Sequence, residues 1–503
     1  MSSAVKDSMH QRGLRLSKPH AQELVNLYSG HAQAENFRGE DLLKINEAHV
    51  IMLQEQGLLN SDEARRILAV IRKLQNKGWE KAIHLDPSIG DLSTHVEAYI
   101  IKETGEGVGG KIHTGRSRND IYLTLARMLV RRFILDVYGA LTGLEKRLLT
   151  LAKEHIETVM PGYTHHSQPA QPITLGHYFV GNFDVFARDL RRIEDFWPRV
   201  NTCPMGAAAL ATTGFPLNRQ RMAELLGFDG IHEHSYDAVS SRDFLLEYLF
   251  ILAQVASDLG RISENILLWA TFEFGMITLA DEYTSFSSIM PQKKNPVAVE
   301  SIRALNSVIS GKLSNALGIL KAEPWSNGRE TIILDDDSVD SGRQVRDMII
   351  LLDGILRTMQ VRKDRMAELA SEGYCTATEL ADTLVRECDL PFRTAHEIVG
   401  MVVKRAIDSG LGPLEVTPEL VNQCARKYFG KDLPIRPESI RRALDPRENV
   451  RVRNLPGGPS FEETARMIVA RKKAMTRQAK FLVHRQNRIA QAEAKRNELG
   501  ILV

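Results

Sequence analysis

Apolar residues recur at intervals of three and four along much of the chain, which is the spacing of one face of an α-helix. Between Ile121 and His155 the apolar positions of this stripe are Leu125, Met128, Leu129, Phe133, Val137, Leu141, Leu144, Leu148 and Leu151. The same spacing covers residues 244–270, 297–320 and 345–359, whereas strand-like alternation is scarce. The pattern predicts an all-α protein with a central bundle of long helices. Long bundles commonly bury their remaining apolar stripes by oligomerising.

Interruptions of this pattern predict a subunit of three parts. Residues 1–112 hold shorter helices and end in the glycine-rich GEGVGG, residues 113–365 hold the long helices, and residues 366–503 return to shorter segments. The final stretch, residues 464–496, is helix-like and basic. Its basic positions are spread round the helix with few aromatics between them, which favours a solvated terminal helix over a nucleic-acid-binding face.

Composition and charge narrow the class of protein. The 503 residues are 43% hydrophobic and 25% charged, with a formal net charge of +2, so no global attraction to nucleic acid or to an anionic membrane is expected. Arginines interrupt the apolar run IYLTLARMLVRRFIL, and the N-terminal MSSAVKDSMHQRG lacks the apolar core of a secretory signal. The widely spaced Cys203, Cys375, Cys388 and Cys424 indicate neither a disulfide framework nor a zinc site. We expect a cytoplasmic protein without a metal or cofactor.

Three polar clusters interrupt the apolar pattern, and the first is GGKIHTGRSRND, residues 109–120. Its arginines alternate with Ser117 and Asn119 just before a long helix begins. The planar fork of an arginine suits a carboxylate, and a helix N-terminus adds backbone donors. A plain helix cap with surface arginines accounts for the same residues equally well.

The second cluster is PGYTHHSQPAQP, residues 161–172. His165 and His166 are adjacent, lie between prolines and are flanked by Thr164 and by Gln168. Two histidines on a proline-bounded loop favour acid–base chemistry, although a histidine is often a satisfied core residue. Metal ligation is disfavoured because no carboxylate or further histidine stands at ligand spacing.

The third cluster is the loop SSIMPQKKNP, residues 287–296. Pro291 and Pro296 each fix a backbone angle, so the hydroxyls and cations between them lie on a constrained loop that suits an anionic ligand. Removing a proton next to a carboxylate requires a base at the carbon and cations at the oxygens. A serine can act as that base when cations such as Lys293 and Lys294 stabilise its alkoxide. The residues for glycosyl or acyl transfer by a carboxylate pair or a Ser–His–Asp set are not evident.

Together the three clusters resemble the motifs of the fumarase/aspartase superfamily. The Gln-Lys-Lys form of the loop, with HTGRSRND and the Thr-His motif, is similar to the argininosuccinate lyase branch. The resemblance implies a homotetrameric enzyme whose active sites each combine the three motifs from three subunits. It also implies a carbon–nitrogen lyase that acts by reversible anti β-elimination. An N-substituted L-aspartate loses its amine and leaves fumarate, without a cofactor.

The resemblance also assigns roles to residues. Ser287 is the base that takes the β-proton, and Lys293 and Asn295 hold the substrate carboxylate and stabilise the enediolate. The histidine of the Thr-His motif serves the departing amine, and Glu300 orients it. The motif is one residue longer than usual, so counting forward favours His165 and counting back from the downstream glutamines favours His166.

We assign the catalytic role to His166 and expect the other polar residues of the motifs to bind substrate. The substrate-binding residues expected are Ser117, Arg118, Asn119, Thr164, His165, Gln168, Ser288, Met290, Asn295 and Arg329.

One segment departs from the argininosuccinate lyase pattern. In EPWSNGRETIILDDD, residues 323–337, Ser326 and Thr331 replace a tyrosine and a glutamine that bind the amino-acid end of the arginine moiety. A histidine is also replaced, at Ser93. We therefore expect an aminopolycarboxylate such as ethylenediamine-N,N'-disuccinate (EDDS), whose distal carboxylates Arg329 would meet, to be preferred over argininosuccinate. An argininosuccinate lyase and a catalytically inactive structural homologue are the alternatives.

Overall fold

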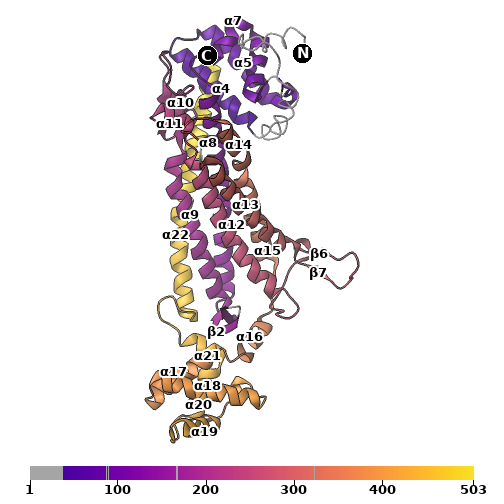
Figure 1. Cartoon of the computed structure of the whole chain (residues 1–503), viewed down its shortest axis with the longest axis vertical. Helices are drawn as coiled ribbons and strands as arrows, with labels where there is room; N and C mark the ends of the chain where they lie inside the picture. Colours follow the sequence, from indigo (N-terminus) through magenta and orange to yellow (C-terminus); the bar gives the residue numbers. More distant parts are fainter. Residues whose placement is uncertain (1–37, 87, 89, 166–167, 322, 503) are drawn as a thin grey trace.

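The computed structural model describes residues 38–86, 88, 90–165, 168–321 and 323–502 and shows an elongated, predominantly helical molecule (Figure 1). Long helices pack side by side along its length. They are α8 (Arg118–Glu154), α9 (Leu175–Val200), α12 (Asp243–Trp269), α13 (Val297–Leu320), α15 (Ser341–Thr358) and α22 (Phe461–Leu502). The prediction of a helical fold built on a long-helix bundle is confirmed.

Shorter helices lie at the two ends of this bundle (Figure 1). Those at the N-terminal end and beside the bundle are α4 (Gly39–Glu55), α5 (Ser61–Lys77), η1 (Trp79–Lys81), α6 (Leu92–Thr104), α7 (Glu106–Gly109), η2 (Gly110–His113), α10 (Arg219–Leu225), α11 (Ser235–Ser240) and α14 (Arg329–Ser338). Those of the opposite end are α16 (Lys363–Glu372), α17 (Ala377–Cys388), α18 (Phe392–Asp408), η4 (Pro413–Glu415), α19 (Pro418–Phe429), α20 (Pro437–Leu444) and α21 (Pro446–Arg451).

The strands form short two-stranded pairs. The antiparallel hairpin of β1 (Val159–Thr164) and β2 (Gln168–Thr174) follows α8 directly. The antiparallel pair of β6 (Ser285–Phe286) and β7 (Lys294–Asn295) closes a loop that projects sideways from the bundle (Figure 1). The remaining described elements are β3 (Thr202–Cys203) with β4 (Gly230–Ile231), β5 (Ile277–Thr278) with β8 (Gln360–Val361), and η3 (Asp281–Tyr283).

Local sequence explains where the bundle helices begin. Ser117 caps α8 through a reciprocal pair of hydrogen bonds with Asp120, and the Thr174 hydroxyl caps α9 by accepting from the His177 N–H at 3.0 Å. Pro296 stands immediately before α13, where its missing N–H costs no helical hydrogen bond. These caps place the polar clusters of the sequence at helix ends.

Two buried arginines of α8 tie the bundle together. The Arg127 guanidinium donates to the carbonyl of Arg199 at 2.7 Å, at the end of α9, and lies over the Phe244 ring. Arg131 donates to the Leu226 carbonyl at 2.8 Å. Carbonyl groups at a helix C-terminus carry partial negative charge, so they stabilise a buried guanidinium. Burial nevertheless lowers the pKa of both arginines to about 10.

The predicted terminal helix is α22, and it is solvated on one face, as expected, while its other face packs on the bundle. This helix packs along α8 and α9 and returns to the N-terminal end of the molecule, drawn in yellow in Figure 1. Arg471 forms a bidentate ion pair with Asp184 at 2.9 and 2.6 Å, and the buried Arg496 pairs with the buried Glu47 at 2.9 Å. One basic face of α22 therefore binds acidic groups of the bundle, while Lys472 lies on the exposed face.

Buried apolar side chains form one large cluster through the bundle and the N-terminal helices, and α22 adds Met467 and Ile468 to it. A second cluster lies within residues 380–444. The division at residues 112 and 365 stays a prediction. Among the described residues we find no helix whose apolar length would span a bilayer.

Glu145 gives a testable consequence of this packing. Its carboxyl on α8 is fully buried, Gln478 of α22 donates to it at 3.3 Å, and its Oε2 has no hydrogen-bond partner within the described chain. Burial raises its pKa from 4.5 to about 8. Because the folded-state pKa is raised, the free energy of unfolding that Glu145 contributes is full at acidic pH and declines as the pH rises toward about 8.

We expect Glu145→Gln to remove this decline. The melting temperature of the variant should exceed that of the wild type by about 1–4 °C at pH 8 and match it near pH 5, as measured by scanning calorimetry. Glu154→Gln, at an exposed position near the end of the same helix, is the matched control and should show no pH-dependent gain. A Glu145→Gln variant without such a gain would contradict the assignment.

Candidate active site

The first polar cluster lies at the start of α8. The carboxylate of Asp120 is fully buried and accepts from the Ser117 N–H at 2.9 Å. It also accepts from the N–H groups of Gly206 at 3.0 Å and Ala208 at 2.9 Å. Burial raises the pKa of Asp120 to about 6 despite these donors. Ala208 has a φ of 53°, an uncommon value for an L-residue, so this carboxylate holds a strained loop over the helix start.

Arg118 and Asn119 follow Ser117 in the first turn of α8. The Arg118 side chain is 65% exposed and pairs with Asp91 at 3.2 Å. Asn119 donates from Nδ2 to the carbonyl of Ala209 at 2.9 Å, and its Oδ1 accepts from Nδ2 of Asn327 at 2.9 Å. The cluster therefore contains both a helix cap and polar side chains that face outward.

The segment that departs from the family pattern lies beside Asn119. Thr331 is buried, and its hydroxyl donates to the Gly328 carbonyl at 2.9 Å, so it stabilises the start of α14. Trp325 is 57% exposed, and its ring centroid lies 4.8 Å from that of Tyr236 and 6.0 Å from that of His234. An aromatic cluster thus occupies the place where the sequence suggested only polar substitutions.

The second cluster forms the tip of the β1–β2 hairpin. Thr164 and His165 are exposed, and the Thr164 hydroxyl lies 3.0 Å from Nδ1 of His165. His165 has a φ of 31°, in the region that disfavours side chains with a Cβ. Gln168 pairs with Thr164 across the hairpin. His166, the predicted acid–base residue, lies outside the described residues.

The third cluster is the loop between β6 and β7. The Ser287 hydroxyl accepts from the Met290 N–H at 3.1 Å. Lys294 donates to the Leu279 carbonyl at 2.7 Å and to Asp281 at 2.6 Å, so it fastens the base of the loop to the preceding segment. The sequence did not reveal this anchoring. Lys293 is exposed, so its ammonium group faces solvent in the single chain.

Apolar side chains on the same loop are also exposed. Phe286 is 86% exposed and Ile289 is 83% exposed. Ser288 lies beside Ser287 at the exposed tip, and Asn295 pairs with Ser285 where the loop returns. Large apolar groups on a projecting loop are typical of a surface that binds a ligand or a partner.

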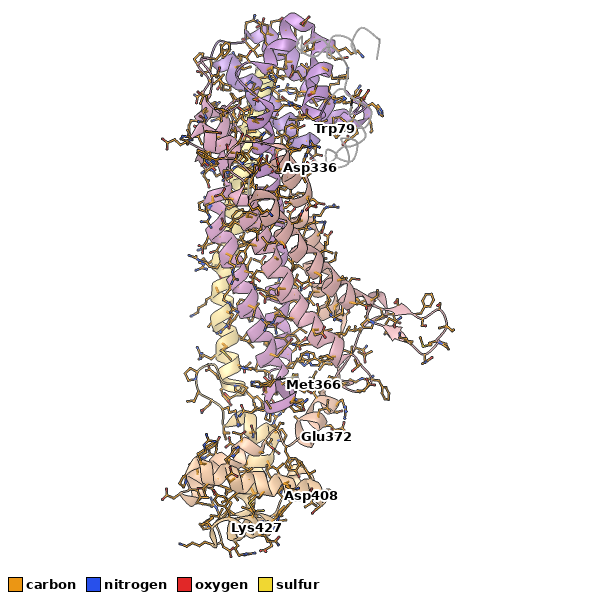
Figure 2. The ribbon with its side chains drawn as sticks, viewed as in Figure 1. Trp79, Asp336, Met366, Glu372, Asp408 and Lys427 are labelled. Atoms are coloured by element: carbon orange, nitrogen blue, oxygen red, sulfur yellow. The ribbon has the colours of Figure 1, made fainter. Side chains whose placement is uncertain are left out.

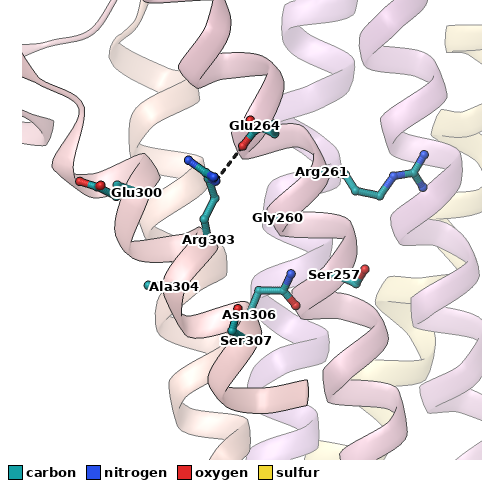
Figure 3. Close-up of a pocket in the computed structure, with 9 residues that line it drawn as sticks. All are labelled: Ser257, Gly260, Arg261, Glu264, Glu300, Arg303, Ala304, Asn306 and Ser307. Carbon is teal, nitrogen blue, oxygen red and sulfur yellow. Dashed lines mark ion pairs between the residues drawn. The ribbon is translucent and has the colours of Figure 1, made fainter. Parts of the chain in front are cut away.

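Glu300 lies one turn into α13 and lines a groove of about 500 Å³ between α12 and α13 (Figure 3). Arg303 pairs with Glu264 in the same groove at 2.7 Å. Asn306 packs against Gly260, where an added Cβ would approach its Nδ2 to 2.8 Å. Glu300 was predicted from the sequence, whereas Glu264, Arg303 and Asn306 were not, because they lie outside the three polar clusters.

The first cluster lies far from the other two in one chain. Helix α8 has 37 residues, so its start with Asn119 and its end beside the β1–β2 hairpin are separated by roughly 55 Å. Helix α13 has 24 residues and separates the loop from the Asn327 segment by roughly 36 Å. Figure 2 places Asp336, near the first cluster, toward one end of the bundle and Glu372 of α16, the helix that packs on β1, toward the other.

Comparisons with known proteins agree with this architecture. A family model described as "Lyase" matches residues 23–311, and one described as "Argininosuccinate lyase C-terminal" matches residues 374–451. The argininosuccinate lyase of Methanocaldococcus jannaschii is 45% identical over 421 residues, which are 84% of this chain and 85% of that protein.

Two solved structures extend the comparison. A structure of an EDDS lyase variant with bound fumarate is 32% identical, with a TM-score of 0.86 over 97% of this chain and 96% of its own. The class II fumarase of Schistosoma mansoni is 16% identical, with a TM-score of 0.67 over 82% of this chain and 90% of its own, and it supports the fold alone.

Proposed function

Because this chain belongs to the argininosuccinate lyase family of the fumarase/aspartase superfamily, we propose that it cleaves argininosuccinate to arginine and fumarate. The family makes it a carbon–nitrogen lyase of the fumarate-releasing type. The observation that carries the choice of substrate is 45% identity to an argininosuccinate lyase over 84% of the chain. The sequence of residues 323–337 suggested an aminopolycarboxylate as the preferred substrate; argininosuccinate, given there as the alternative, is now the proposed one.

In the proposed reaction Ser287 removes the β-proton. Its hydroxyl already accepts the Met290 N–H at 3.1 Å, and a backbone donor of this kind stabilises the alkoxide that a serine base requires. Lys293 and Asn295 receive the negative charge that moves onto the substrate carboxylate. Lys294 supports them indirectly, because it anchors the loop to Asp281.

The departing amine leaves on the side of the histidine motif. His166 protonates the amine, with Thr164, His165 and Gln168 shaping the hairpin around it. Glu300 orients the histidine from the groove between α12 and α13. At the other end of the substrate, Arg118 and Asn119 bind the carboxylates of the fumarate half, and the cap made by Ser117 presents both to it.

We propose that each site is shared by three chains of a homotetramer. The separation of the motifs along α8 and α13 supports this assembly. So does the exposure of α13, a helix in which only Ala298, Val299, Ile302, Ile309 and Ala316 are buried. Its exposed apolar residues would be covered in a bundle of subunits.

Trp325 offers a contact for the arginine end of the substrate. A guanidinium stacks favourably on an aromatic face, and such contacts contribute about 0.5–2 kcal/mol. Tyr236 and His234 hold the indole in place beside the Asn119–Asn327 contact. This aromatic surface would offset the polar contacts that Ser326 and Thr331 no longer supply.

A second candidate reaction is favoured by one comparison. The EDDS lyase structure covers 97% of this chain at a TM-score of 0.86, so elimination from an aminopolycarboxylate remains the competing proposal. Arg329, at the start of α14, would then meet distal carboxylates of that substrate.

The cytoplasm is the proposed location, because all four cysteines are free in the structure.

We expect Ser287→Ala to lower kcat by about 10²–10⁴, because the reaction would lose its positioned base. Fumarate release, followed by ultraviolet absorbance, measures this loss, while the melting temperature should not change. Ser288→Ala, at a neighbouring position expected to bind substrate, should raise KM but lower kcat far less than Ser287→Ala does. Comparable losses in both variants would mean that the loop, rather than the Ser287 hydroxyl, is responsible.

We expect the wild type to cleave argininosuccinate with a higher kcat/KM than EDDS. Trp325→Leu should lower kcat/KM for argininosuccinate by about 2–30-fold, and Trp325→Phe should retain most of it, because only the aromatic face is needed. Both ratios come from the same fumarate assay. A wild type that prefers EDDS would refute the proposed substrate and leave the lyase chemistry intact.

A further inference from the structure

We infer that Arg242 and Asn327 are positioning residues that fix which way the side-chain amide of Asn119 faces the substrate. The inference rests on the proposed function, because it assigns a purpose to the contact between Asn119 and the fumarate half. It concerns a chain of hydrogen bonds that begins at a buried ion pair and ends at Asn119.

The series of hydrogen bonds begins at Arg242, immediately before α12. This residue is 4% exposed, and its guanidinium donates to both oxygens of Asp335, from Nε at 2.9 Å and from Nη2 at 3.1 Å. Asp335 is itself 7% exposed and belongs to α14. A bidentate pair of this kind holds the guanidinium in one plane and one orientation.

The next step is Asn327, which precedes α14. Arg242 donates from Nη2 to Oδ1 of Asn327 at 2.9 Å. Asn327 in turn donates from Nδ2 to Oδ1 of Asn119 at 2.9 Å. Three side chains from separate segments therefore form a continuous relay.

The chemistry of arginine sets the direction of every bond in this relay. A guanidinium has only donors, so the Asn327 atom that faces it must be the oxygen. The amide nitrogen of Asn327 then points at Asn119, where it requires an acceptor, so Oδ1 of Asn119 must occupy that position. The two orientations of the Asn327 amide therefore become distinct, and for Asn119 the relay adds to the preference that the Ala209 carbonyl, also an acceptor, already sets.

The orientation of Asn119 has a consequence for an anionic ligand. Its Nδ2 carries two hydrogens, and one of them goes to the Ala209 carbonyl at 2.9 Å. Among the described residues we find no acceptor for the other hydrogen, which leaves it for a ligand. Asn119 thus offers a donor to a substrate carboxylate, whereas the reversed amide would offer a carbonyl oxygen that repels it.

Asn327→Asp tests this inference with almost no change of shape. The introduced carboxylate can still accept from Arg242, but it cannot donate to Asn119. Because a carboxylate attracts N–H groups more strongly than the Ala209 carbonyl does, the amide of Asn119 should then rotate, give up its bond to Ala209 and turn its carbonyl toward the substrate. We expect the dissociation constant for fumarate, measured by calorimetry on the assembled enzyme, to rise about 10–100-fold.

A second variant separates orientation from simple loss of contact. Asn327→Leu removes the relay without imposing the wrong orientation, so its fumarate affinity should fall between those of the wild type and Asn327→Asp. Asn265→Asp is the matched control, since Asn265 donates to the Tyr178 hydroxyl at 2.9 Å away from the site, and fumarate affinity should not change. If Asn327 only stabilised the fold, each variant should lose fumarate affinity in proportion to its loss of melting temperature.

The outcomes distinguish the inference from the function on which it rests. If the wild type binds fumarate and Asn327→Asp binds it equally well, or if Asn327→Leu and Asn327→Asp weaken binding equally, the relay does not orient Asn119. If the wild type binds no fumarate, the proposed function itself is overturned and the inference falls with it. Fumarate is common to both candidate substrates, so the test does not depend on which amine leaves.

Discussion

The fixed rise of an α-helix keeps its two ends apart, and α8 imposes this constraint on the whole subunit. Its 37 residues hold Asn119 at one end of the bundle and the histidine hairpin at the other, about 55 Å away. Buried Arg127 and Arg131 fasten α8 to neighbouring helix ends, so the helix cannot bend the two motifs together. The shared site between chains that we propose would join the motifs across this distance.

Ion pairs between residues that are far apart in the sequence stabilise this arrangement. Arg496 of α22 meets Glu47 of α4, and Arg242 before α12 meets Asp335 of α14. Removing one partner of such a buried pair leaves an uncompensated charge. An arrangement that separated the two partners would carry the same cost, so these pairs favour the observed packing of the helices. The Arg242 pair also orients a side chain that we place in the active site, so the same interaction serves fold and chemistry.

The sequence allowed the long helices to be predicted closely, because their apolar periodicity is local. The stretch 121–155 corresponds to α8, and 297–320 coincides with α13. The environment of α22 was not predictable, since its Arg471 pairs with Asp184, far away in the chain. The motifs named candidate residues for the site but gave no indication that Asn327 contacts Asn119, because no local pattern links positions so distant.

The central claim, that a site is built from motifs of different chains, is tested most directly by mixing two inactive variants. Asn119→Leu disables the first motif and Ser287→Ala disables the third, and the two proteins are dissociated, mixed in equal amounts and reassembled. If different chains supply the two motifs, about one site in four receives an intact copy of each, so fumarate production should recover to about a quarter of the wild-type rate. If a single chain supplied both motifs, every site would carry one defect, and a mixture that stays inactive after confirmed subunit exchange would contradict the account.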